Sequence, residues 1–125
     1  MELNDLTYKI RGAIFTVHTE LGPGLLESVY EAAVSYELIQ LGLVVKSQVG
    51  LPVNYKDQKL ELGFRIDVLV EDSVIIEIKS VEVLHDVHKK QLLTYLKLSG
   101  KKLGILVNFN VSKLIDKENL IRIIN

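Results

Sequence analysis

Two apolar runs separated by three polar residues most restrict how this chain can fold. Residues 60–70 (LELGFRIDVLV) and 74–80 (VIIEIKS) are rich in Ile, Val and Leu and alternate between apolar and polar positions, a pattern typical of strands. The connection Glu71-Asp72-Ser73 is polar and has the length of a hairpin turn. The sequence therefore predicts an antiparallel hairpin that is symmetric about Asp72.

This register would place two carboxylates opposite each other. The Cβ atoms of Asp67 and Glu77 would lie roughly 4.5–5.5 Å apart, and like charges so close repel. A divalent cation could compensate them, and so could the ammonium of Lys79 on the same face. Such a patch suits metal-assisted phosphodiester cleavage. The alternative is a solvent-facing hairpin with diagonal ion pairs, Asp67 with Lys79 and Arg65 with Glu77, and the hairpin sequence leaves both interpretations open.

The composition is that of a compact domain without covalent cross-links. The chain has 125 residues, of which 48% are hydrophobic and 25% charged, which predicts one folded domain over residues 1–125. It has no cysteine, so any metal must be held by oxygen or histidine ligands. No apolar run approaches the roughly 18 residues of a membrane span, and the N-terminal residues lack a signal-peptide core. We therefore expect a cytoplasmic protein with no membrane contact.

Charge is distributed unevenly along the chain. Residues 1–82 carry 13 acidic and 7 basic side chains, whereas residues 83–125 carry 3 acidic and 8 basic ones. A basic C-terminal third can attract a polyanion such as nucleic acid. The candidates for phosphate contacts are Lys89, Lys90 and Lys97, and a solvated helix face explains these lysines equally well.

Periodicity and glycine punctuation divide the rest of the chain into helices and strands. Apolar side chains recur at helical spacing in three segments, residues 4–20, 25–41 and 86–99. Gly22-Pro23-Gly24 separates the first two helices, and Asn4 or Asp5 suits the first N-cap. Further strands are expected at residues 43–49, 51–55 and 102–108, while residues 114–125 contain a strand or a helix. This order predicts an α/β fold, a sheet covered by helices.

Several short blocks, taken together and in order, resemble the GxxExxY proteins. Gly24 to Tyr30 (GLLESVY) fits the pattern G-x-x-E-x-x-Y. The later blocks are Phe64-Arg65-Ile66-Asp67, Glu77-Ile78-Lys79, Gln91-x-x-x-Tyr95 and Val107-Asn108-Phe109. The GxxExxY group is assigned to the PD-(D/E)xK nuclease-like superfamily, and the resemblance extends from Val17-His18 to Phe109. Two residues depart from the usual pattern, Ile66 in place of proline and Asn110 in place of glycine.

The resemblance implies a fold, an activity and a metal site. The fold would be a restriction-endonuclease-like core of the αβββαβ type, with a mixed β-sheet flanked by helices. The activity would be hydrolysis of nucleic acid, DNA first of all, with Mg²⁺ or Mn²⁺ as cofactor. Asp67 and Glu77 would bind the metal, together with the backbone carbonyl of Ile78 and the helix acid Glu27. Lys79 would position the attacking water.

The resemblance also implies supporting residues around this site. Gln91 would contact the water or the phosphate, and we expect Tyr95 and Arg65 to support the site. Tyr30 is expected to support the site too, and it either hydrogen-bonds Glu27 or packs. The three histidines, His18, His85 and His88, are expected to be solvent-facing or capping groups.

Two alternatives stay open: a catalytically inactive module that binds nucleic acid or protein, and an adaptor that forms a homodimer through its apolar surface.

Overall fold

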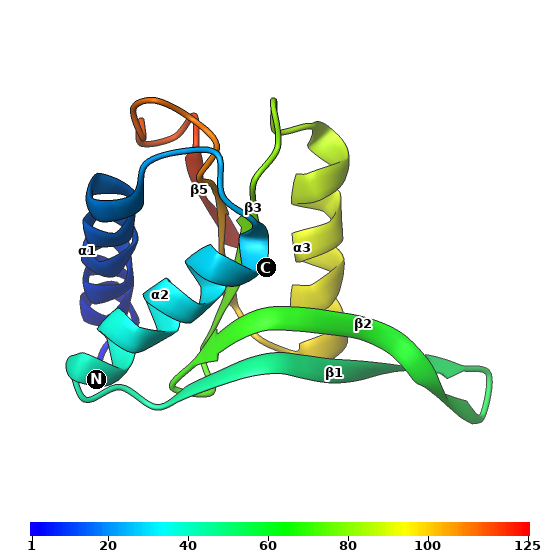
Figure 1. Ribbon diagram of the computed structural model, residues 1–125. Coiled ribbons are helices and arrows are strands. Elements are labelled where there is room, and N and C mark those ends of the chain that lie inside the picture. Colours follow the sequence, from blue (N-terminus) through cyan, green and yellow to red (C-terminus); the bar gives the residue numbers. More distant parts are fainter.

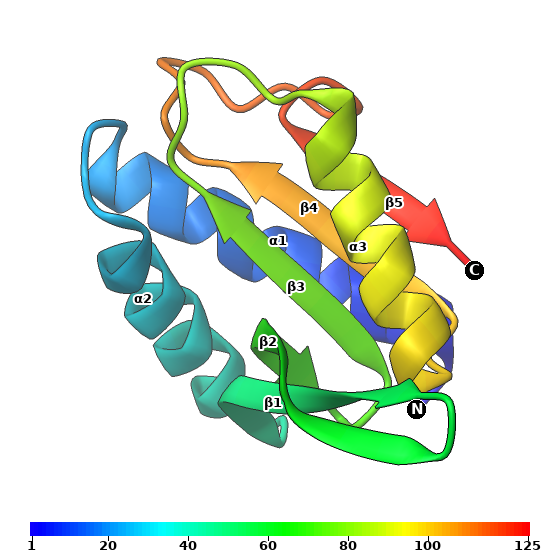
Figure 2. The ribbon, with the colours of Figure 1, turned by 90° about the vertical axis from the view of Figure 1, so that its right-hand side faces the viewer.

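The computed structural model describes residues 1–125, except for the side chain of Leu62. The chain forms three layers, with a sheet between α1 and α2 on one face and α3 on the other (Figures 1 and 2). The elements in chain order are α1 (Leu3–Leu21), α2 (Glu27–Gln40), β1 (Val45–Tyr55), β2 (Gln58–Val70), β3 (Val74–Lys79), α3 (Asp86–Ser99), β4 (Leu103–Asn108) and β5 (Leu120–Ile124). None of these helices is long and apolar enough to cross a membrane.

The sheet has five strands in the order β1-β2-β3-β4-β5 and is mixed. Only β3 and β4 pair in parallel, and α3 makes the crossover between them; the other neighbours are antiparallel. Figure 2 shows β3 and β4 running side by side beneath α3, with β5 running the opposite way. The predicted α/β fold with a mixed sheet and flanking helices is thus confirmed.

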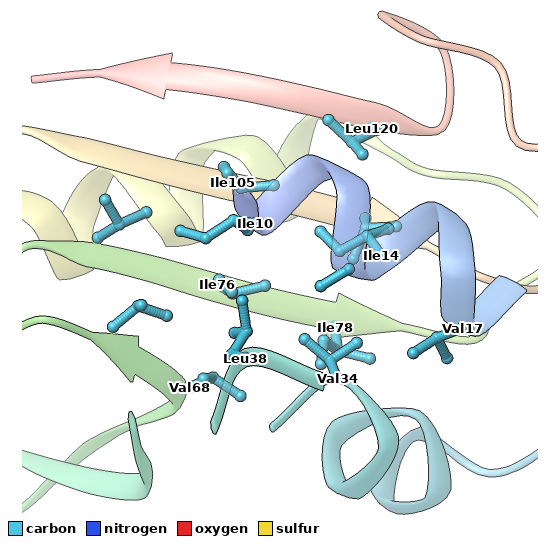
Figure 3. Close-up of a cluster of buried hydrophobic side chains, with 14 of the residues drawn as sticks. Ile10, Ile14, Val17, Val34, Leu38, Val68, Ile76, Ile78, Ile105 and Leu120 are labelled. Carbon is cyan, nitrogen blue, oxygen red and sulfur yellow. The ribbon is translucent and has the colours of Figure 1, made fainter. Parts of the chain in front are cut away.

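Each face of the sheet has its own apolar cluster. On the α1 and α2 face, side chains of both helices interdigitate with those of the strands (Figure 3); they include Ile10, Ile14, Val34, Leu38, Val68, Ile76, Ile78 and Ile105. On the α3 face, Leu92, Tyr95 and Leu96 pack on strand residues such as Ile75 and Leu106. Each such large side chain contributes about 1.5–3 kcal/mol when fully buried.

The structure differs from the expected elements in three places. Residues 43–49 and 51–55 form one strand, β1, whose register shifts between Leu51 and Val53. Pro52 lies at this shift and, lacking an N–H, cannot donate to the ladder. The element left open near the C-terminus is the strand β5. The N-cap of α1 is Glu2, so the prediction of Asn4 or Asp5 is wrong by about one turn.

Candidate active site

β2 and β3 pair in the register that the sequence predicts. Leu69 lies opposite Ile75, and both Glu71 and Asp72 in the connection have the positive φ angles, 52° and 51°, of a tight turn. The regular pairing extends from the turn only as far as Val68 and Ile76. Beyond this pair the two strands separate, so the next residues of each strand face a gap in the ladder.

Two carboxylates hydrogen-bond to backbone amides in that gap. The Asp67 N–H donates to Oε1 of Glu77 at 3.3 Å, and the Ile78 N–H donates to Oδ2 of Asp67 at 2.8 Å. Each acid therefore accepts a hydrogen bond from the strand of the other. The backbone groups that the separation would leave unpaired are satisfied by the side chains.

The strands separate because both β1 and β2 bend at this level. Val68 packs in the cluster on the α1 and α2 face, but Ile66 packs under α3, although alternate residues of a regular strand share one face. In β1, Gln48 has a φ of 54° and interrupts the pairing with Asp67. The prediction of unbroken alternation through Ile66 and Val68 is therefore wrong, and the break falls at Asp67.

Burial makes this pair electrostatically unusual. The Glu77 side chain is 3% exposed and Asp67 is half-buried, so the alternative of a solvent-facing hairpin is wrong. Burial, with the Asp67 charge adding to it, raises the pKa of Glu77 to about 8. Burial also raises the pKa of Asp67, against the opposing effect of the Ile78 N–H and of Lys79. In the metal-free protein at neutral pH, Glu77 is therefore the protonated member of the pair.

Lys79 supplies the positive charge nearest to the acids. It is half-buried at the end of β3, and its ammonium lowers the pKa values of both Asp67 and Glu77. Arg65 does not pair with Glu77, because its guanidinium donates to the carbonyl oxygen of Gln48 at 3.1 Å. The Gln48 side-chain amide in turn donates to both carboxylate oxygens of Glu31, at 3.0 and 2.9 Å.

Glu27 lies at the edge of this cluster. It is the first residue of α2 and is exposed, and its charge contributes to the raised pKa of Asp67. Its Oε2 accepts a hydrogen bond from the Ser80 N–H at 2.9 Å. Among the described side chains, no three acidic or histidine residues are grouped closely enough to hold one metal ion. The positions therefore do not support Glu27 as a direct ligand beside Asp67 and Glu77.

Tyr30 organises the loop that carries Glu27. Its hydroxyl donates to the carbonyl oxygen of Gly22 at 2.6 Å and accepts from the Leu25 N–H at 3.1 Å. Its ring is fully buried and stacks on Phe109, with ring centroids 4.4 Å apart and planes 6° apart. Of the two alternatives, packing is confirmed, and the hydroxyl contacts the loop backbone.

One face of α3 completes the surroundings of the acids. His88, Gln91 and Tyr95 are spaced three and four residues apart and so share a side of the helix. Burial, with the charges of Glu77 and Asp67 adding to it, raises the pKa of Tyr95 to about 12, while a hydrogen bond with Gln91 opposes the shift. Gln91 thus contacts the hydroxyl of Tyr95 next to the acids.

Three residues near the site were not predicted to belong to it. Partial burial and the Lys79 charge lower the pKa of His88, and the Glu27 charge opposes the shift, which places its ring near Lys79 and Glu27. Its Nδ1 also accepts the His85 N–H at 3.0 Å, the capping role expected. The spacing of three and seven residues from His88 to Gln91 and Tyr95 puts the three on one side of the helix and would have indicated His88 from the sequence. The other two residues are Ser80 and Asn108, and Asn108 is 1% exposed.

Asn108 fixes the segment that follows the site lysine. Its Nδ2 donates to the Val81 carbonyl oxygen at 2.8 Å, and its Oδ1 accepts from the Val81 N–H at 3.0 Å. The end of β4 is thereby joined to the chain just beyond β3.

The lysines proposed for phosphate contacts, Lys89, Lys90 and Lys97, are exposed on α3 and do not line the acids.

The oxygen atoms at the gap suit a hard divalent cation. Lys79 directs its carbonyl oxygen towards β4, where it accepts from the Phe109 N–H at 2.9 Å. Successive carbonyls of a strand point in opposite directions, so that of Ile78 points towards β2, where Asp67 lies. Two carboxylates and a carbonyl are ligands that Mg²⁺ and Mn²⁺ prefer. The residues present therefore fit such an ion.

Comparison with known proteins agrees with this geometry. The sequence profile of the PD-(D/E)XK nuclease superfamily matches residues 4–123, nearly the whole length of the chain. No curated protein and no solved structure matches the chain. The match covers α1 to β5 and includes every residue of the acidic gap. The chain belongs to the PD-(D/E)XK nuclease superfamily.

Proposed function

We propose that this protein is a Mg²⁺-dependent nuclease that hydrolyses phosphodiester bonds in DNA. The observation that carries the proposal is the buried pair Asp67 and Glu77, held across a break in the sheet with Lys79 beside it. Two carboxyl groups buried side by side are costly to a protein that does not use them, because one of them must take up a proton to avoid the repulsion of like charges. In a member of a nuclease superfamily, a cation bound between the two acids explains why the pair is kept.

The residues of the gap divide the work between them. Asp67, Glu77 and the Ile78 carbonyl would hold the metal, whose chemistry would be to lower the pKa of a water and to offset charge on the phosphate. Lys79 orients that water and offsets negative charge in the transition state. Glu27 acts from the edge, where its bond to the Ser80 amide fixes the end of β3. Gln91 holds the Tyr95 hydroxyl against the acids.

Finer assignments rest on the same residues. We assign the chain to the GxxExxY group within the superfamily, because Gly24, Glu27 and Tyr30 of that pattern have separate structural tasks here. Gly24 has a φ of 94°, which only glycine adopts without strain; Glu27 contacts the site and Tyr30 closes the loop. We also infer one domain over residues 1–125, because α1 and β5 pack on the same sheet.

The test is cleavage by purified protein of labelled DNA and RNA, with Mg²⁺, with Mn²⁺ and with EDTA. We expect metal-dependent cleavage that Asp67→Ala and Lys79→Ala reduce by at least a hundredfold. Asp72→Asn is the matched control, because Asp72 is an exposed acid in the turn of the same hairpin and asparagine tolerates its φ of 51°. Equal cleavage by the wild type and by both site variants would show that another site or a contaminant is responsible.

The alternative is an inactive module on the same fold. It predicts nucleic-acid or protein binding that persists in EDTA, with no cleavage under any metal. Calorimetric titration with Mn²⁺ separates the two further. Binding that Asp67→Ala abolishes supports the metal site even if the substrate has not been found, whereas no Mn²⁺ binding at millimolar concentration contradicts it.

A further inference from the structure

The β1–β2 ribbon, residues 49–66, begins at the acidic gap and extends past α3. Its inner part is anchored, since the Phe64 ring lies against that of Tyr95 with centroids 5.1 Å apart. Val49 and Leu51 pack on the same cluster. The outer part continues beyond the helix with no element covering it (Figure 1). A two-stranded arm, packed on α3 at its base, therefore extends from the strand that carries Asp67.

The ribbon differs in charge from the rest of the first 82 residues. Its basic side chains are Lys56, Lys59 and Arg65, and its acidic ones are Asp57 and Glu61. Outside the ribbon, residues 1–82 carry 11 acidic and 4 basic side chains. A polyanion that approaches the acidic gap thus meets on the ribbon a segment with a net positive charge, in a region that is otherwise acidic overall.

The tip presents an aromatic ring and an ammonium on opposite faces. Tyr55 pairs with Gln58, and the neighbouring pair is Asn54 with Lys59. Neighbouring pairs of a ribbon project to opposite faces. Tyr55 is 58% exposed, and the ammonium of Lys56 lies 5.4 Å from the centroid of its ring. An unpaired nucleotide offers both a base that can stack and a phosphate that can bind an ammonium.

A second protein molecule suits this tip less well. Among the side chains that the structure describes, the large apolar ones exposed at the tip are those of Tyr55 and Leu60, 58% and 43% exposed. Stable protein interfaces bury about 800 Å² on each partner, far more than two side chains supply. The mixture of one ring and scattered cations matches a charged single strand better than an apolar protein surface.

We propose that the ribbon is a gripping arm for a single-stranded segment of nucleic acid next to the acidic gap. Tyr55 stacks on a base on one face of the tip, and the strand passes over the tip, so that Lys56 beside the ring and Lys59 on the opposite face each bind a phosphate. The inference rests on the proposed nuclease function for its ligand, but it concerns binding and not cleavage. It predicts a preference for substrates with an unpaired strand over fully paired duplex.

The test is fluorescence anisotropy of a labelled 20-nucleotide single strand and of its duplex, in EDTA so that neither is cut. Tyr55→Ala should weaken single-strand binding roughly tenfold and change duplex binding little. Lys56→Ala/Lys59→Ala should lower the slope of log affinity against log salt by about 1.4 for the single strand. The matched control is Lys9→Ala/Lys113→Ala, which removes two cations outside the ribbon and should leave both values unchanged.

The outcomes separate this inference from the proposed function. Asp67→Ala should keep single-strand binding and lose cleavage. Ribbon variants that bind as the wild type does, while cleavage still depends on Asp67, overturn the arm and leave the nuclease intact. Loss of binding in the ribbon variants, with no cleavage by any protein, supports the arm and contradicts the nuclease. If light scattering shows a dimer that Tyr55→Ala dissociates, the tip binds a second copy and the inference is wrong.

Discussion

Glu27 and Ser80, which are 53 positions apart in the sequence, meet through a 2.9 Å hydrogen bond from the Ser80 N–H to the Glu27 carboxylate. A second bond, from the Ser80 hydroxyl to the Leu25 carbonyl oxygen at 2.7 Å, lies beside it. Ser80 directly follows Lys79. The start of α2 and the end of β3 are therefore fixed to each other, and the site lysine is positioned by a helix that precedes it by fifty residues.

This clamp predicts different effects for two substitutions of Glu27. Glu27→Gln keeps an oxygen acceptor for the Ser80 amide but removes the charge, whereas Glu27→Ala removes both. We expect Glu27→Ala to lower the free energy of unfolding by about 1 kcal/mol and Glu27→Gln to change it less. Urea denaturation measures both. Equal losses in the two variants would show that charge matters and the hydrogen bond does not.

Tyr30→Phe tests whether the hydroxyl closes the loop. The variant keeps the stack on Phe109 but leaves the Gly22 carbonyl and the Leu25 N–H without their shared partner. We expect a loss of about 1–3 kcal/mol in the free energy of unfolding. Tyr36→Phe is the control, since Tyr36 is on the same helix and 61% exposed. Similar values for the two variants would mean that the loop does not depend on the Tyr30 hydroxyl.

Glu77→Gln should stabilise the metal-free protein at alkaline pH. Because the pKa of Glu77 rises from 4.5 to about 8 on folding, folded protein binds this proton more tightly than unfolded protein. Its contribution is fully present below pH 4.5 and is lost as the pH rises through about 8. Glutamine does not titrate. We expect the two proteins to unfold alike near pH 4.5 and the variant to be more stable above pH 8, by about 2–4 kcal/mol.

Denaturation in EDTA across this pH range measures the difference. If the free energies of unfolding of the two proteins differ by a constant amount from pH 4.5 to 9, the raised pKa of Glu77 is contradicted. Saturating Mg²⁺ should stabilise the wild type at high pH and so reduce the difference in the free energy of unfolding between the two proteins, because a bound cation stabilises the ionised carboxylate.

Gly104→Ala should disturb the contact between α3 and β4. A Cβ at this position would lie 2.8 Å from a methyl carbon of Leu92, too close unless the helix shifts. We expect a loss of about 1–3 kcal/mol in the free energy of unfolding. Because α3 also carries Gln91 and Tyr95, cleavage should fall as well. The control is Gly50→Ala, since no atom lies within 4 Å of a Cβ built there.

Local features of the sequence were enough to predict much of this fold. The hairpin register follows from the three-residue turn and the alternation beside it, and both are properties of neighbouring residues. The bounds of α3, Asp86–Ser99, follow in the same way from helical spacing and from Gly100, whose φ of 73° ends the helix. Fold class then follows from the order of such elements.

The features that could not be predicted depend on contacts between distant segments. The bend at Asp67 arises opposite Gln48, and no spacing within either strand indicates it. Asn108 lies in a nearly continuous apolar run, and only its pairing with Val81 explains its burial. Glu27 stands at a helix start, where any acidic residue is favourable. Its contact with Ser80 could therefore not be predicted from the sequence either.

The register of β1 against β2 is the same on both sides of the bend at Asp67 and Gln48, as the pairs Ser47 with Val68 and Val49 with Ile66 show, and it shifts only between Leu51 and Val53. The ladder thus accommodates an irregularity in the outer ribbon while the pairing next to the acidic gap stays in register. Adding or removing a pair of residues near the ribbon tip would change the reach of the arm without moving a carboxylate. Ribbon length and the geometry of the acidic gap can therefore change separately.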